Sequence, residues 1–325
     1  MDRSTFIATC NSLAEQSVPF LFVVDFELQR FHVYELNKVD PAKIYYVTPK
    51  HTNVGHSLIG PMDKAVRFEK SPMDYNIYLR AFNYVMEHIM HGNSFLLNLT
   101  FPTSVTTNLT LEDIFMRSRA KYKLLFNNRF TVFSPETFIK IEEGKIWSYP
   151  MKGTIDAGIE GAAEKILADT KEQWEHNTIV DLIRNDLSMV AKGVEVSRFR
   201  YIDRLRTFDK ELLQVSSEVC GALPGDWKSV LGEILVRQLP AGSVSGAPKK
   251  KTLELIAAAE QERRGYFTGI FGIFDGEEVD SSVMIRYIEK TAAGLQYRSG
   301  GGITGRSNPV EEYNEMLNKV YVPIF

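Results

Sequence analysis

The order of strand-like and helix-like segments is the feature of this sequence that most constrains its fold. Short apolar runs such as residues 19–26 are typical of buried strands, and they come in groups with helix-like segments scattered among them. A parallel sheet with helices on both faces would need a regular alternation of strand and helix. Because that alternation is missing and no repeat or linker divides the chain, the sequence predicts an α+β fold in a single domain over residues 1–325.

Three segments carry start or stop signals. Ser71, followed by a proline, predicts the cap of a helix whose inner face carries Ile77, Ala81, Val85 and Ile89. The glycines at 300–302 predict a break after a strand. A final helix is expected from residue 309 to residue 319, because a proline opens it.

A β-hairpin is predicted near the middle of the chain. Strand-like residues 137–141 and 145–149 flank a Glu-Gly turn at 143–144. Hairpin arms run antiparallel, so Glu136, before the first arm, and Lys152, beyond the second, are expected to lie side by side.

Lys152 is a candidate nucleophile. A proline and a glycine bracket it within the otherwise apolar segment 149–154. Burying an ammonium group among apolar groups is expensive, so such a lysine loses part of its preference for the charged form and becomes available for attack. The sequence therefore predicts a reactive lysine with the carboxylate of Glu136 beside it.

Two glutamates at the start of the last helix are candidate metal ligands. Glu312 and Glu315 are three residues apart and so share a helix face. Two carboxylates on one face repel each other unless solvent, a basic partner or a divalent cation lies between them, and oxygen ligands suit Mg²⁺. Glu175 would complete such a site if the fold brings it close. The alternative is a solvated acidic helix face.

Other segments offer binding groups for an anion. The Pro/Gly-rich loop 239–249 leads directly into a helix, and glycines 300–302 would let a ligand approach the backbone. Arg286 could form a bidentate pair with a carboxylate. Each feature has an alternative as a turn or a structural ion pair, but together they indicate a small substrate with several negative charges.

Composition excludes several classes of protein. The net charge is −3, too close to neutral to predict binding to nucleic acid or to an anionic membrane surface. No apolar run is long enough to span a bilayer, and no signal peptide is evident. The two cysteines, Cys10 and Cys220, form no metal or redox pattern. A cytoplasmic location is expected.

An ordered set of motifs resembles the chorismate-utilising enzymes, and among them most closely component I of the aminodeoxychorismate synthases. The motifs run from about residue 130 to the end of the chain, while residues 1–125 are more divergent. The matching segments are 134–138, 150–154, 175–176, 180–187, 240–249, 263–265, Asp280, Val283, 285–286, 300–303, 308–315 and Lys319.

This resemblance implies a fold and a reaction. The fold would be two large packed antiparallel β-sheets with outer helices, one chorismate-binding catalytic domain with the active site between the sheets. Anthranilate synthases have alanine where this chain has Lys152, whereas aminodeoxychorismate synthases typically have lysine. In the reaction, the lysine would attack carbon 2 of chorismate as the carbon 4 hydroxyl leaves, with Glu136 as general acid/base. Ammonia would then add at carbon 4 and expel the lysine.

The resemblance also implies roles for the binding residues. Glu175, Glu312 and Glu315 would hold Mg²⁺, which binds the ring carboxylate. Ser243 and Lys319 have alternative roles as supports of their loop and helix. The residues expected to bind the substrate are Gly153, Thr154, Ser243, Phe267, Arg286, Gly300, Gly302 and Lys319.

Two positions depart from the family pattern. Gln214 stands where many relatives have histidine, and Phe267 stands where a tyrosine hydroxyl is usual. Neither cysteine lies in a nucleophile turn, so ammonia is expected from a separate glutamine amidotransferase subunit or from solution. Three alternatives stay open: anthranilate synthase component I, an isochorismate or salicylate synthase, and a chorismate-binding subunit without catalysis.

Overall fold

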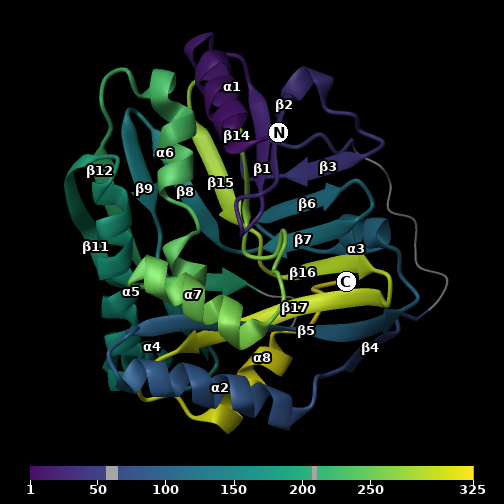
Figure 1. The fold of residues 1–325 in the computed structure, drawn as a ribbon, viewed down its shortest axis with the longest axis vertical. Helices are drawn as coiled ribbons and strands as arrows, with labels where there is room; N and C mark the ends of the chain where they lie inside the picture. The colour runs from purple at the N-terminus through teal and green to yellow at the C-terminus, as the bar shows by residue number, and fades with distance from the viewer. Residues whose placement is uncertain (56–64, 207–210, 325) are drawn as a thin grey trace.

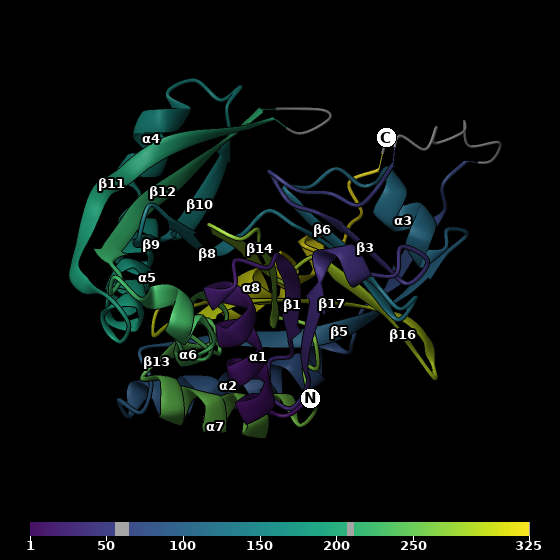
Figure 2. The same cartoon turned by 90° about the horizontal axis from the view of Figure 1, so that it is seen from above.

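The computed structural model describes residues 1–55, 65–206 and 211–324. In these residues the chain forms two large β-sheets, one of nine strands and one of eight, with helices on the outside (Figures 1 and 2). Neighbouring strands run antiparallel in both sheets. This architecture confirms the predicted α+β fold with two large antiparallel sheets.

The first sheet contains the predicted hairpin. Its arms pair Ile141 with Ile146 and Glu142 with Lys145, so this prediction is confirmed. The strand order is β10 (Met151–Asp156), β12 (Glu211–Ala222), β9 (Lys145–Ser148), β8 (Thr137–Glu142), β15 (Val279–Val283), β14 (Ile270–Phe274), β1 (Phe20–Val24) and β2 (Phe31–Glu35), with β11 (Lys192–Arg206) paired to β12.

The second sheet lies against the first. Figure 2 shows β10, β11 and β12 at one side of the molecule and β3 and β6 at the other. The strand order is β13 (Gly246–Ala247), β5 (Leu96–Thr107), β17 (Gly294–Ile303), β16 (Tyr287–Thr291), β7 (Phe130–Ser134), β6 (Tyr122–Phe126) and β3 (Ile44–Val47), with β4 (Phe68–Ser71) paired to β5.

The predicted break at glycines 300–302 is wrong, because these residues continue strand β17. Gly300 pairs with Thr100 of β5, and Gly302 pairs with Asn98. A Cβ on Gly300 would lie 2.2 Å from the carbonyl oxygen of Leu99. Gly300 is therefore required by the close approach of the neighbouring strand and not by a turn.

Helices cover the outer faces of the sheets (Figure 1). In the described part of the chain, none of them is long and apolar enough to cross a membrane. Their bounds are α1 (Arg3–Glu15), α2 (Tyr75–Met90), α3 (Leu111–Arg117), α4 (Ala162–Ala168), α5 (Thr170–Ser188), α6 (Leu231–Arg237), α7 (Lys249–Glu260) and α8 (Pro309–Asn318), with short 3₁₀ turns η1 (Leu36–Lys38), η2 (Trp227–Val230) and η3 (Gly242–Val244).

Strand β1 shows how the layers are held together, because its side chains alternate between two buried clusters. Phe20, Phe22 and Val24 belong to the cluster that the first sheet forms with α1, α5 and α6. Leu21 and Val23 belong to the cluster between the two sheets. Each strand of this kind therefore ties an outer helix layer to the sheet interface.

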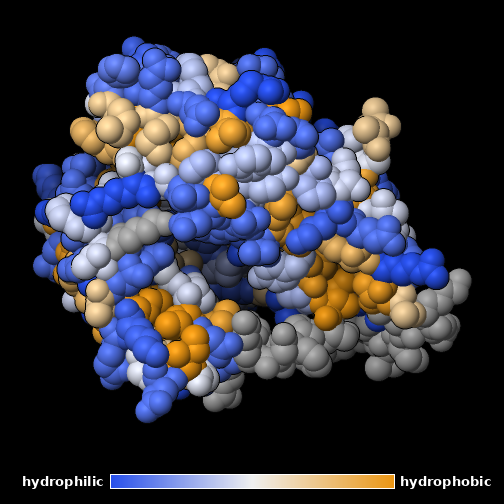
Figure 3. Space-filling model, turned by 90° about the horizontal axis from the view of Figure 1, so that it is seen from below, coloured by the Kyte–Doolittle hydropathy of each residue, from blue (hydrophilic) through white to orange (hydrophobic). Residues whose placement is uncertain are grey.

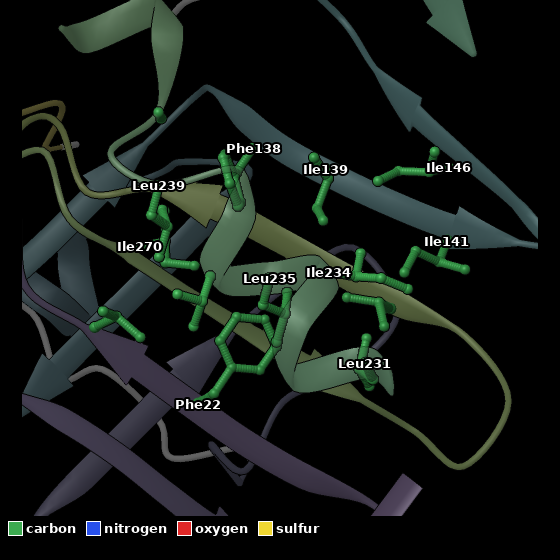
Figure 4. Close-up of a cluster of buried hydrophobic side chains, with 14 of the residues drawn as sticks. Phe22, Phe138, Ile139, Ile141, Ile146, Leu231, Ile234, Leu235, Leu239 and Ile270 are labelled. Carbon is green, nitrogen blue, oxygen red and sulfur yellow. The ribbon is translucent and has the colours of Figure 1, made fainter. Parts of the chain in front are cut away.

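Helix α6 illustrates the outer layer of the first sheet. Figure 4 shows its Leu231, Ile234 and Leu235 beside Ile139 and Ile141 of β8. All five side chains are buried in one cluster. Burying an aliphatic side chain of this size stabilises the fold by roughly 1.5–3 kcal/mol.

The start of helix α2 differs from the prediction. Ser71 ends strand β4, and Asp74 caps the helix by accepting a hydrogen bond from the backbone N–H of Asn76. Ile77 does not face a core, because 46% of it is exposed. The prediction placed the cap three residues too early. The predicted inner face is confirmed further along the helix, where Ala81 and Val85 are buried.

Candidate active site

One pocket, of about 500 Å³, is lined by strands of both sheets and by helices α5 and α8. Figure 3 shows the molecule hollowed near the centre of the face seen from below, where hydrophilic side chains predominate. Every residue that the sequence analysis assigned to a site lies on the wall of this pocket. They are Glu136, Lys152, Gly153, Thr154, Glu175, Ser243, Phe267, Arg286, Gly300, Gly302, Glu312, Glu315 and Lys319.

Lys152, on β10, forms an ion pair on this wall. Its Nζ lies 2.6 Å from Oε2 of Glu175, and 25% of its side chain is exposed. Burial alone would lower the pKa of Lys152, but Glu175 outweighs burial and raises it, and Glu172 and Glu315 add to this effect. The expectation that apolar surroundings weaken the charge is therefore wrong. Carboxylates hold Lys152 as an ammonium ion.

Glu172 is a site residue that the sequence analysis missed. It lies one helical turn before Glu175 on α5, and both line the pocket. Burial raises the pKa of Glu172, and Lys152 opposes that rise. The signal was in the sequence, because this pair has the same three-residue spacing that identified Glu312 and Glu315.

Gly153 lets strand β10 approach Glu172. The glycine has φ of +77°, and the register with β12 shifts between Lys152 and Thr154. A Cβ at this position would lie 3.0 Å from Oε2 of Glu172. A glycine is therefore favoured at position 153 for two reasons: the backbone is left-handed there, and the carboxylate of Glu172 leaves little space for a side chain.

Helix α8 presents the second pair of carboxylates. Glu312 is 5% exposed and accepts a hydrogen bond from Oγ of Ser307 at 2.8 Å. Glu315 lies 2.6 Å from Nζ of Lys319, which also donates to the carbonyl oxygen of Gly300 at 2.8 Å. The alternative of a solvated acidic face does not hold for Glu312, because that side chain is buried against the pocket.

The carboxylates suit Mg²⁺ in chemistry but are not gathered around one point. Among residues 1–55, 65–206 and 211–324, no group of three acidic, histidine or cysteine side chains lies close enough together to hold a metal ion. The pocket nevertheless collects Glu172 and Glu175 from one helix and Glu312 and Glu315 from another. Glu172 Oε2 and Glu175 Oε1 are buried and accept no hydrogen bond. Such carboxylate oxygens are the donors that Mg²⁺ prefers.

Glu136 lies just before β8, with Ser243 beside it. Oγ of Ser243 donates a hydrogen bond to Oε1 of Glu136 at 2.5 Å. Burial raises the pKa of Glu136, while the Ser243 hydrogen bond and the charges of Arg286 and Lys319 oppose the rise. A carboxyl group with a raised pKa can carry the proton that a general acid must give.

Arg286 and Lys319 bring positive charge to the pocket. Burial alone would lower the pKa of Arg286, but Tyr297 and Tyr321 raise it, with Glu136 adding to the effect. Burial lowers the pKa of Lys319, and Glu315 opposes this. The Nε atom of Arg286 is buried and has no hydrogen-bond partner, so the guanidinium keeps a free donor.

Tyr321, in the segment after α8, supports Arg286 and was not identified from the sequence. The Cζ atom of Arg286 lies 5.5 Å from the centre of the Tyr321 ring. Tyr321 itself is 46% exposed. Nothing in the sequence around Tyr321 signals this contact, because only the fold brings the two residues together.

The two departures from the family pattern also lie on the pocket wall. Phe267 is 3% exposed, and its ring centre lies 5.9 Å from that of Tyr287. Gln214 pairs with Thr154 across β12 and β10. The pocket therefore has a packed phenyl ring and a neutral amide where the family pattern has a hydroxyl and an imidazole.

The fold and the pocket together define a class, that of α+β enzymes with a polar, carboxylate-rich site between two antiparallel sheets. The chain belongs to one family of that class, the chorismate binding enzymes, whose sequence profile matches residues 22–324. The resemblance drawn from the motifs is confirmed at this level.

Three relatives illustrate the range of this family. An "uncharacterized PabA-like protein" of Pasteurella multocida is 46% identical over 324 residues, 100% of both chains. Anthranilate synthase component 1 of Aquifex aeolicus is 35% identical over 195 residues, 57% of this chain and 38% of that protein. A "putative aminodeoxychorismate synthase" of Schizosaccharomyces pombe is 30% identical over 261 residues, 75% of this chain and 35% of that protein.

A solved structure shows the same fold. The menaquinone-specific isochorismate synthase MenF of Escherichia coli matches with a TM-score of 0.74, over 97% of this chain and 80% of that one, at 16% identity. At this identity the likeness supports the architecture of two antiparallel sheets and says nothing further about the reaction.

Proposed function

We propose that this chain is component I of an aminodeoxychorismate synthase, a transferase that makes 4-amino-4-deoxychorismate from chorismate and ammonia for p-aminobenzoate and folate synthesis. The observation that carries the proposal is Lys152 on the wall of the same pocket as Glu136. Two names among the relatives, "putative aminodeoxychorismate synthase" and "PabA-like protein", support it. We include in the proposal a single catalytic domain over residues 1–325 and a cytoplasmic location.

The proposed reaction passes through a covalent adduct. The neutral amine of Lys152 attacks carbon 2 of the ring, both ring double bonds shift by one position, and the carbon 4 hydroxyl leaves as water with a proton from Glu136. Ammonia then attacks carbon 4, both double bonds shift back, and Lys152 leaves carbon 2. Glu136 takes a proton from the incoming nitrogen and is ready for the next cycle. One difficult substitution thus becomes two easier ones.

Lys152 must lose a proton before it attacks. The carboxylate of Glu175, 2.6 Å away, holds the lysine as ammonium and is also placed to accept that proton. Binding of the substrate brings further negative charge into the pocket. The positive charges of Arg286 and Lys319 offset this added charge. The proposed role of Glu175 is therefore to keep Lys152 oriented until the substrate arrives.

Mg²⁺ is the proposed cofactor. Glu175, Glu312 and Glu315 would hold it, with Glu172 as a fourth carboxylate, and the ion would neutralise the ring carboxylate of the substrate. Coordination by Glu175 would require Lys152 to leave its ion pair, and without that carboxylate the lysine would lose its proton more readily. The substrate itself would contact Gly153, Thr154, Ser243, Phe267, Arg286, Gly300, Gly302 and Lys319.

A glutamine amidotransferase is the proposed partner. Both cysteines of this chain are buried, and burial raises the pKa of each thiol. A buried thiol of this kind is not a glutaminase nucleophile, which needs an exposed thiolate. Ammonia would then come from a separate subunit or from solution.

The reaction is tested with purified protein, chorismate, Mg²⁺ and an ammonium salt. Formation of 4-amino-4-deoxychorismate, separated by chromatography, supports the proposal, as does a mass adduct on Lys152 in protein quenched with chorismate. Anthranilate and pyruvate as the products would show an anthranilate synthase instead. Turnover without ammonia would show an isochorismate or salicylate synthase, and binding without turnover would show a non-catalytic subunit.

A further inference from the structure

A buried ion pair closes the loop that carries Ser243. Nζ of Lys249 lies 2.9 Å from Oδ1 of Asp186, and the two side chains are 21% and 10% exposed. Asp186 lies near the end of α5, and Lys249 begins α7. Neither residue lines the 500 Å³ pocket, so neither contacts a molecule bound there.

Both ends of the loop are attached to Asp186. At the first end, Nε2 of Gln238 donates to the backbone carbonyl of Asp186 at 2.8 Å. At the other end, Lys249 forms the ion pair and also donates to the carbonyl oxygen of Gln238 at 3.3 Å. These contacts fix residues 238 and 249 relative to each other and to helix α5.

The carboxylate of Asp186 also limits where the middle of the loop can lie. A Cβ on Gly242 would lie only 2.8 Å from Oδ2 of Asp186. Gly242 immediately precedes Ser243, whose Oγ donates to Glu136. A cavity of about 20 Å³ is lined by Asp186, Gln238, Gly242, Ser243 and Glu136 together. The carboxylate of Asp186 thus lies against the residue that directly precedes Ser243, the residue that contacts Glu136.

The far side of the loop has its own supports. Nη1 of Arg264 donates to the carbonyl oxygen of Val244 at 2.7 Å. The backbone N–H of Asn98 donates to the carbonyl oxygen of Ser245 at 2.8 Å. These bonds fix residues after Ser243. Before Ser243, the carbonyl oxygen of Ala241 accepts a hydrogen bond from Oγ of Ser245 at 2.8 Å, and Asp186 limits the position of Gly242.

We propose that Asp186 and Lys249 are positioning residues for the reaction: their ion pair fixes Gly242 and so keeps the hydroxyl of Ser243 on Glu136. The inference rests on the proposed function, in which Glu136 gives a proton to the leaving hydroxyl. Replacing a buried ion pair by apolar groups often leaves stability unchanged. We therefore assign this ion pair the role of positioning Gly242 and Ser243 rather than of stabilising the fold.

A double-mutant cycle tests the inference. Asp186→Asn keeps the shape of the side chain and removes its charge. We expect kcat to fall about tenfold or more while KM for chorismate changes less than about threefold, because only the proton transfer is disturbed. In a Ser243→Ala background the same substitution should change kcat less than about twofold, because the contact it supports is already gone. Equal losses in both backgrounds would overturn the inference.

Matched controls separate positioning from folding. Asp181→Asn makes the same change on the same helix, at a side chain 68% exposed that pairs with Arg184 at 3.4 Å, and should leave kcat unchanged. Asp186→Asn combined with Lys249→Met removes both charges and should restore thermal stability but not kcat. Recovery of both together would mean that the pair is only structural.

A crystal structure of Asp186→Asn gives a result that does not depend on activity. We expect Oγ of Ser243 to leave hydrogen-bonding distance of Glu136. A contact retained at its present length would refute the positioning role. If the protein forms no aminodeoxychorismate, the proposed function fails, and this structural result still decides whether Asp186 holds Ser243.

Discussion

Nζ of Lys152 lies 2.6 Å from Oε2 of Glu175. The proposed nucleophile is therefore paired with a carboxylate that is also a proposed ligand of Mg²⁺. The other oxygen, Oε1 of Glu175, is buried without a partner. In the proposed function, Lys152 and Mg²⁺ would be alternative counterions for the same buried carboxylate. This competition would link release of the amine to binding of the metal, and it can be measured.

Lys152→Ala should make the protein less stable without Mg²⁺ and more responsive to it. Removing one member of a buried ion pair costs about 3–5 kcal/mol of unfolding free energy, because the remaining charge is uncompensated. Mg²⁺ should restore part of this loss, and it should raise Tm more in the variant than in the wild-type protein, where Lys152 competes. Thermal unfolding with and without Mg²⁺ measures both effects.

The same variant should lose activity. Aminodeoxychorismate formation should fall more than about 100-fold, since removal of a nucleophile costs orders of magnitude in kcat. Some elimination to anthranilate is expected in its place. A variant that Mg²⁺ stabilises no more than the wild type, or that keeps full activity, contradicts the roles given to Lys152 and Glu175.

Much of the pocket could be predicted from the sequence because its residues lie in motifs with local geometry. The three-residue spacing of Glu312 and Glu315 fixes a shared helix face wherever the helix lies. The hairpin was predicted in the same way, but the expectation that it sets Glu136 beside Lys152 is not met by the strand order: β9 and β12 lie between β8 and β10, and the two residues share only the wall of the pocket. Rules of this kind depend only on residues close together in the sequence, so they can be applied before the tertiary structure is known.

What could not be predicted depends on contacts between distant segments. The pKa of Lys152 is raised because helix α5 places two carboxylates against β10, and no local pattern around the lysine contains that information. Tyr321 reaches Arg286 only through the path of the chain after α8. Helix α1 was not predicted, because it buries only Phe6, Cys10 and Ala14, too narrow an apolar stripe to be recognised.

Ser243→Ala should shift the pH dependence of kcat. In the proposed reaction Glu136 acts as the acid, so the rate should fall as pH rises through its pKa. The hydrogen bond from Ser243 stabilises the carboxylate and lowers the pKa. Its removal should therefore move the falling limb to higher pH by about one to two units, since a hydrogen bond to a charged group contributes about 1.5–3 kcal/mol. An unchanged limb, or a shift to lower pH, would argue against Glu136 as the acid.

Tyr321→Leu should weaken substrate binding more than it slows chemistry. The ring of Tyr321 and the guanidinium of Arg286 form a cation–π contact, and without it Arg286 is less well oriented toward a carboxylate. We expect KM for chorismate to rise about three- to tenfold, in line with the strength of such contacts, and kcat to change little. Tyr321→Phe keeps the ring but removes the hydroxyl, which raises the pKa of Arg286, so this variant separates the effect of the ring from that of the hydroxyl. A fall in kcat with unchanged KM would assign Tyr321 a different role.

His32 should make the protein less stable in mild acid. Burial lowers the pKa of His32 to about 4, and the N-terminal amine, Arg129 and Arg30 add to the shift. Its Nε2 lies 2.9 Å from the hydroxyl of Tyr266. Between pH 4 and about 6.5 the unfolded chain binds a proton that the folded chain does not, so the unfolding free energy falls as pH decreases through this window.

His32→Asn removes this contribution, so the variant should lose less stability between pH 7 and pH 5 than the wild-type protein does. The difference between the two losses is expected to be about 1–2 kcal/mol, because each pKa unit corresponds to about 1.4 kcal/mol. Urea unfolding at both pH values measures it, and His91→Asn, at an exposed histidine, is the control. Equal losses in all three proteins would mean that His32 is already protonated in the folded state or that solvent reaches it. The interaction between His32 and Tyr266 would then not depend on a neutral imidazole.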